Sequence, residues 1–82
     1  MRLDKYLKVS RIIKRRTVAN DACDSGRVSL NGKVAKPSQE VKIGDIIEIR
    51  FGSNLTTAEI VSVNAQASKS DAQGMYKIIK EE

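Results

Sequence analysis

The chain has 82 residues, with 15 Lys plus Arg against 10 Asp plus Glu, so its formal net charge is +5. It contains no histidine and one cysteine, Cys23, which excludes a disulfide framework, a cysteine-rich zinc site and the commonest general base. The length allows one domain with a modest core, and the 4% aromatic content makes that core mainly aliphatic.

Two short helices are expected first. Leu3, Tyr6 and Leu7 recur at helical spacing and predict a helix over 3–9. We expect Tyr6 to pack in the core with its hydroxyl exposed. Asp4 lies in the first turn, where a carboxylate complements the helix dipole or orients a neighbouring cation, either Arg2 or Lys8.

The second helix is expected over 17–25, with Thr17 as its N-cap and Gly26 just beyond its end. Its apolar stripe consists of small residues, so it is predicted to pack closely against another element. Cys23 lies on this stripe and is expected to act as a small buried hydrophobe.

Beyond Gly26 the apolar pattern alternates and predicts strands. Asn31-Gly32 is a strong turn signal for a hairpin over 28–35. Further strands are expected over 46–51, 55–64 and 75–80, whereas residues 65–74, rich in Ser, Gln, Ala and Asp, are expected to form a mobile loop. The order predicts an α+β fold in which two short N-terminal helices pack on a small, largely antiparallel sheet.

Positive charge is concentrated in the first half of the chain. Residues 1–42 have a net charge of +7, whereas residues 43–82 have −2. Four cations lie in the run 11–17, between the helices and at the start of the second, where guanidinium groups and backbone amides would meet a phosphate together. The pattern favours a nucleic acid as partner; the alternative is a solvated face, or pairing with Asp21, Asp24 and Glu40.

Other classes of function have less support. Asp4 has no histidine or second acid beside it in the sequence, and neither a phosphate-cradling glycine loop nor a metal-ligand cluster is present, so we expect no enzyme activity, no cofactor and no metal. The first helix lacks the Trp or Phe of a membrane-binding face. No apolar run is long enough for a signal peptide or a membrane span, which predicts a cytoplasmic protein.

Several motifs, in order and at matching spacing, resemble the S-four RNA-binding domain. They are Arg2-Leu3-Asp4-Lys5-Tyr6-Leu7, Arg11, Arg15-Arg16-Thr17-Val18-Ala19, Gly26-Arg27-Val28-Ser29-Leu30-Asn31-Gly32-Lys33, Pro37-Ser38 and Gly44-Asp45. The resemblance covers 1–50, and 51–82 is expected to be a strand extension that completes the sheet in the same globular unit. In that family a helix pair presents the RNA-binding surface. The implied RNA contacts are Arg2, Lys8, Arg11, Lys14, Arg15, Arg16 and Thr17.

A stand-alone domain of this length is similar to the RqcP type (also called YabO) of bacterial ribosome-associated quality control. The resemblance implies a non-catalytic factor, monomeric off the ribosome, that binds the large ribosomal subunit through large-subunit rRNA and tRNA. It also implies a tailing-factor partner that adds alanine to a stalled nascent chain. The alternatives are a large-subunit recycling factor like heat-shock protein fifteen and a general binder of structured RNA. The acidic second half leaves room for a protein contact alongside RNA binding.

Overall fold

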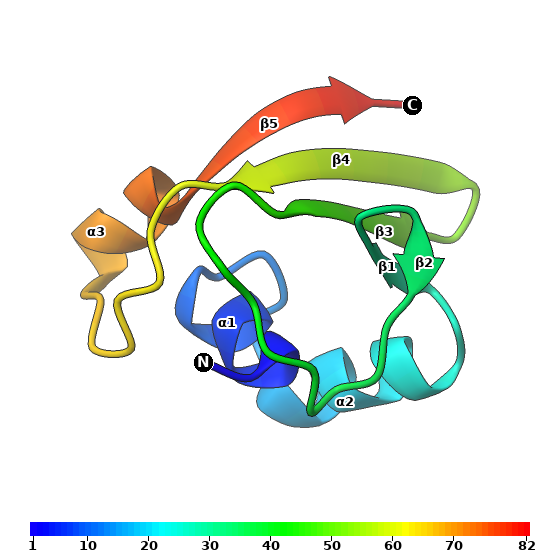
Figure 1. Ribbon diagram of the computed structural model, residues 1–82, viewed down its shortest axis with the longest axis horizontal. Helices are drawn as coiled ribbons and strands as arrows, with labels where there is room; N and C mark the ends of the chain where they lie inside the picture. Colours follow the sequence, from blue (N-terminus) through cyan, green and yellow to red (C-terminus); the bar gives the residue numbers. More distant parts are fainter.

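The computed structural model describes all residues 1–82. The chain begins with two helices, α1 (Leu3–Val9) and α2 (Arg16–Asp24). They pack against each other and lie below the β-sheet in Figure 1. The side chains of Leu3, Tyr6 and Leu7 are fully buried, so the helical stripe of the sequence is the face that α1 turns to the core. In α2 the small residues Ala19, Ala22 and Cys23 are buried, as their spacing predicts.

Helix α2 starts one residue earlier than the sequence indicates. Its N-cap is Arg15, whose backbone is extended and whose carbonyl accepts the first helical hydrogen bond from the Ala19 amide at 3.0 Å. The prediction of Thr17 as N-cap is therefore wrong. Thr17 lies inside the first turn, and no side chain caps this helix.

Five strands follow and form one antiparallel sheet in the order β2-β1-β3-β4-β5. Their bounds are β1 Val28–Leu30, β2 Lys33–Val34, β3 Ile46–Phe51, β4 Asn54–Ile60 and β5 Tyr76–Glu81. The predicted hairpin is confirmed, and its central residues Asn31 and Gly32 both have positive φ, 52° and 84°. This is the backbone that a two-residue hairpin turn requires and that Asn-Gly adopts readily.

The inner face of the sheet meets the helices. Val28, Leu30, Ile47 and Ile49 point to that side and are buried, which confirms the alternating pattern of β1 and β3. Phe51, at the end of β3, is 40% exposed and lies beyond Ile49, the last residue of β3 that pairs with β1. The helices, the antiparallel sheet and their order agree with the predicted α+β class.

The segment between β4 and β5 differs from the expectation. Strand β4 ends at Ile60, and the expected mobile loop contains a helix, α3 (Lys69–Ala72), followed by a 3-10 turn, η1 (Gln73–Met75). Ser68 and Asp71 form a capping box in which the Ser68 hydroxyl accepts from the Asp71 amide at 3.3 Å. Burial of Ala72 and Met75 holds this segment on the core. None of the helices is long and apolar enough to cross a membrane.

Candidate nucleic-acid interface

Asp4 organises the exposed side of the helix pair. Its side chain is buried, and the Arg2 guanidinium donates to both carboxylate oxygens, from Nε to Oδ1 and from Nη2 to Oδ2, each at 3.2 Å. From α2, Arg16 Nη2 lies 3.4 Å from Oδ1 and Asn20 Nδ2 lies 3.4 Å from Oδ2. One carboxylate thus holds two arginines, one from just ahead of α1 and one from the start of α2.

The carboxylate of Asp4 is ionised despite its burial. Desolvation raises the pKa of Asp4, but the Lys5 backbone amide, which donates to Oδ1 at 2.8 Å, together with Asn20, Arg16 and Arg2, outweighs it and lowers the pKa below its ordinary value. An ionised carboxylate is the partner that two guanidinium groups require. The prediction that Asp4 orients Arg2 or Lys8 is confirmed for Arg2. The other cation bound to Asp4 is Arg16 rather than Lys8.

The loop 36–41 fixes the start of α1. The Pro37 carbonyl accepts from the Asp4 amide at 3.1 Å, and the Gln39 carbonyl accepts from the Leu3 amide at 2.8 Å. A β-bridge between Arg2 and Glu40 continues this contact. These bonds satisfy amides that a helix start would leave unpaired, and they hold the Asp4 backbone in place.

Both arginines present part of their side chains to solvent. The side chain of Arg2 is 50% exposed and that of Arg16 is 48% exposed, although each is anchored to a buried carboxylate. A guanidinium group has five N–H donors, so each arginine retains donors for a second partner. The pair is therefore pre-oriented for an external anion and loses less side-chain freedom on binding than free arginines would.

The other predicted contacts lie on the helix pair or in the loop that joins its two helices, and Asp4 does not hold them. Lys8, Arg11, Lys14 and Arg15 are exposed and form no ion pair, and Thr17 is exposed in the first turn of α2. The expected alternative, pairing of the cations with Asp21, Asp24 or Glu40, does not occur. Glu40 pairs with the Met1 amine instead.

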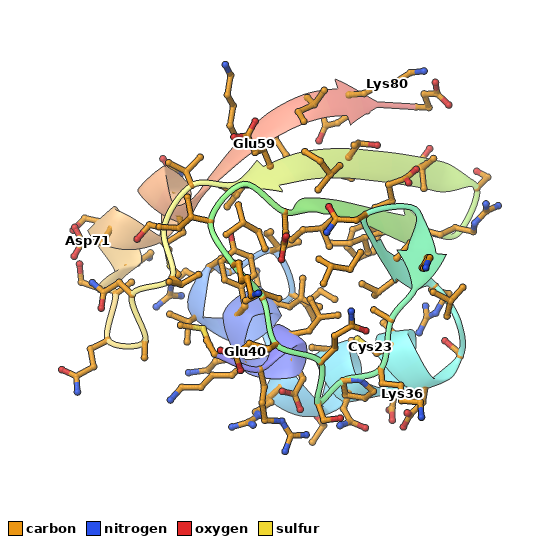
Figure 2. The ribbon with its side chains drawn as sticks, viewed as in Figure 1. Cys23, Lys36, Glu40, Glu59, Asp71 and Lys80 are labelled. Carbon is orange, nitrogen blue, oxygen red and sulfur yellow. The ribbon has the colours of Figure 1, made fainter.

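Two carboxylates of the second half, Glu59 and Asp71, lie on other elements. Figure 2 shows Glu59 on the side of β4 and β5 and Asp71 on the outer side of α3, both away from α2. The helix pair therefore presents a cationic surface that these carboxylates do not neutralise. No group of three or more His, Cys, Asp or Glu side chains is arranged to hold a metal ion.

Two buried polar groups of the helix pair are structural. The Tyr6 hydroxyl donates to the Met75 carbonyl at 2.7 Å, so the expectation of an exposed hydroxyl is wrong, and burial raises the pKa of Tyr6. Cys23 is buried on α2, as predicted (Figure 2). Burial, with the nearby Asp4 and Asp24, raises the pKa of Cys23 to about 11, so its thiol stays protonated near neutral pH.

One residue of the Asp4 cluster is absent from the sequence-based set. Asn20 donates to Asp4 and lies four residues after Arg16, on the same face of α2. The spacing of Arg16 and Asn20 is the available signal, but only the crossing of the two helices shows that both meet Asp4.

The fold and this surface define a small RNA-binding module in which a helix pair presents arginines beside a supporting sheet. A family model, the S4 domain, matches residues 1–47. Relatives in Streptococcus pneumoniae (54% identical, covering 99% of this chain and 92% of the relative) and Bacillus subtilis (51%, 100% and 95%) are both named RQC P-site tRNA stabilizing factor. The chain belongs to the S4 domain family and, within it, to the family of these stabilizing factors.

Solved structures agree with the fold. The trimeric structure of Vibrio cholerae heat shock protein 15 has a TM-score of 0.87 and 37% identity, covering 95% of this chain and 80% of that one. The solution structure of a hypothetical protein, HP1423, has a TM-score of 0.82 and 33% identity, and the match covers both chains completely. A heat shock protein 15 homologue of Aeromonas salmonicida is 32% identical over 94% of this chain but only 59% of its own length.

Proposed function

We propose that this protein is a non-catalytic factor of ribosome-associated quality control that binds the large ribosomal subunit and steadies a tRNA there. The observation that carries the proposal is the pair of half-exposed arginines, Arg2 and Arg16, held on the buried carboxylate of Asp4. Pre-oriented guanidinium forks match the geometry of backbone phosphates. The names of the relatives support the ribosomal setting.

The proposed contacts are large-subunit rRNA and tRNA, which the helix pair binds through phosphate groups. The proposed contact residues are Arg2, Lys8, Arg11, Lys14, Arg15, Arg16 and Thr17. By holding the tRNA of a stalled nascent chain, the protein supports alanine addition by a tailing partner. It acts as a cytoplasmic monomer off the ribosome and performs no chemistry of its own.

A second candidate is a large-subunit recycling factor of the heat shock protein 15 kind. The likeness to the Vibrio cholerae structure favours it. The matched share of each relative's length favours the quality-control role, because the match spans 92% and 95% of the two stabilizing factors but 59% of the Aeromonas salmonicida homologue. Alanine tailing reconstituted from purified components separates the two, since only the quality-control role predicts that adding this protein increases the tailed product.

The binding surface is tested with Arg16→Ala and sedimentation with large subunits that carry a peptidyl-tRNA. Loss of charge-assisted phosphate bonds, worth about 1.5–3 kcal/mol, predicts binding about 10- to 100-fold weaker. Binding of the wild type should also fall steeply with salt, because neutralised phosphates release counterions.

Arg50→Ala is the matched control, because Arg50 is exposed on β3, is not part of the Asp4 cluster, and its removal causes the same charge change. It should bind within about twofold of the wild type. Equal losses in the two variants would show that net charge, rather than the oriented arginine pair, determines binding. Thermal unfolding of each variant confirms that the fold is retained.

A further inference from the structure

A second cationic feature lies on the helix pair, separate from the Asp4 cluster. A pocket of about 350 Å³ forms between the end of α1, the loop before α2 and the segment that precedes α3. Its lining consists of Lys8, Val9, Arg11, Lys14, Ala65 and Ala67. Three of these six residues are cations and none is acidic, so the pocket has the charge and the polarity of an anion site.

The three cations of the pocket have no partner within the protein. The side chains of Lys8, Arg11 and Lys14 take part in none of the ion pairs or side-chain hydrogen bonds, in contrast to Arg2 and Arg16. Three like charges that line one pocket, with no counter-charge beside them, repel one another, and an anion in the pocket would relieve this repulsion. Their placement around one cavity therefore points to a ligand rather than to the stability of the fold.

The backbone at Arg11 supports this interpretation. Arg11 has φ of 62°, in the left-handed region that favours glycine or asparagine. The conformation is held by the Arg11 amide, which donates to the Lys8 carbonyl at 3.1 Å, and by the Ile13 amide, which donates to the Leu7 carbonyl at 3.0 Å. A long cationic side chain in a backbone that glycine would adopt with less strain is a feature associated with functional sites.

The opposite wall comes from the second half of the chain. Ala65 is exposed and Ala67 packs partly against the core, so the wall is made of small side chains that leave the cavity open. The segment is held by bonds from the Gln66 amide to Asn64 Oδ1 at 3.0 Å and by the capping box at Ser68. This wall lies outside residues 1–47, which match the S4 domain.

We propose that this pocket binds one phosphodiester group of an RNA backbone, as a second RNA contact distinct from the Asp4-held arginine pair. The inference rests on the proposed function for the identity of the RNA. Lys8, Arg11 and Lys14 supply the positive charge. The opposite wall, residues 64–67, limits the width of the pocket to that of a single phosphate group. The second half of the chain thereby contributes to RNA binding through the wall of the pocket, although its net charge is negative.

The test compares Ala65→Glu with Gln66→Glu. Both variants add one negative charge to the same exposed segment, but only Ala65 lines the pocket. A carboxylate in the lining of the pocket that holds three cations is expected to weaken binding to large subunits carrying peptidyl-tRNA by about 10-fold or more, whereas Gln66→Glu should stay within about twofold. Equal effects of the two variants, or no effect of either, would overturn the proposal.

A second readout is independent of the ribosome. Inorganic phosphate, titrated at constant ionic strength with sodium chloride as the reference, should shift the backbone amide resonances of Arg11, Ala65 and Ala67 in the wild type and in Gln66→Glu, but not in Ala65→Glu. Shifts confined to other residues would contradict the pocket. If phosphate binds in this way while the wild type fails to bind large subunits, the proposed function fails and the phosphate site stands.

Discussion

The two halves of the molecule are built differently. Eleven of the fifteen residues in the buried cluster belong to residues 1–41, and only Ile47, Ile49, Ile60 and Met75 come from the rest of the chain. Strand β5 is exposed at every residue after Tyr76. The first half therefore contains most of the core and most of the positive charge, whereas the second half is attached by strand pairing and a few anchor points.

One anchor between the halves is the bond from the Tyr6 hydroxyl to the Met75 carbonyl. Met75 is itself buried, and its carbonyl also accepts from the amides of Val61 and Ser62, at 2.8 and 3.1 Å. A side chain of α1 thus reaches the point where β5 begins. The helix pair therefore depends on the C-terminal segment for the hydrogen bond of Tyr6, one of its largest core residues.

The largest expected effect comes from Tyr6→Ala, which removes the largest fully buried side chain. We expect the free energy of unfolding to fall by about 3–5 kcal/mol, measured by urea denaturation. Tyr6→Phe removes only the hydroxyl, and because Met75 keeps two other donors the loss should be about 1 kcal/mol. If Tyr6→Ala unfolds at nearly the same urea concentration as the wild type, the anchor between the halves is not where we place it.

An intermediate effect is expected for Asp4→Asn, which keeps the size of the side chain and removes its charge. Because the folded pKa of Asp4 is lowered, its ionised form stabilises the fold above the ordinary value near 3.8, and this stability is lost as the pH falls below that value. At pH 7 the variant should lose about 1–3 kcal/mol and bind RNA more weakly, since Arg2 and Arg16 lose their anchor.

The pH series distinguishes the charge of Asp4 from its packing. Urea denaturation at pH 7 and at pH 3 should show a smaller difference for Asp4→Asn than for the wild type. An unchanged difference would show that Asp4 is not the titrating group. Asp21→Asn is the control, because Asp21 is an exposed carboxylate of the same helix pair without an ion pair.

The smallest effect is expected for Ser68→Ala, which removes the capping box of a four-residue helix. We expect a loss of about 1 kcal/mol or less, with faster amide hydrogen exchange confined to residues 69–75. Ser53→Ala is the matched control, since Ser53 is exposed in the turn between β3 and β4 and lies outside the capping box. Faster exchange that extends into α1 would show that the two halves are less distinct than their burial indicates.

Local patterns in the sequence were sufficient for most of the fold. The apolar stripe of α1 and the Asn31-Gly32 turn act through near neighbours, so both were predicted correctly. Helix α3 was not predicted, because it is only four residues long and lies in a polar segment of the sequence. Its one signal was the pair Ser68 and Asp71, in which Asp replaces the Glu or Gln of the usual capping box.

The candidate site was predicted as a set of cations but not as an arrangement. All six cationic side chains proposed to contact RNA are exposed, yet the sequence does not show which of them share a partner. That division depends on how α1 crosses α2, which brings Arg16 and Asn20 to Asp4, and on a loop about fifty residues away that closes the second pocket. Such contacts are tertiary, and no local spacing encodes them.

The capping of α1 by the loop 36–41 has a consequence for the order of folding. The amides of Leu3 and Asp4 bond to the carbonyls of Gln39 and Pro37, so the first turn of α1 is complete only after the hairpin and its loop have been synthesised. The Tyr6 hydroxyl donates to the Met75 carbonyl, which follows it by 69 residues in the chain, so this bond forms later still. A translating ribosome therefore makes Arg2 and Arg16 before the residues that complete the first turn of α1.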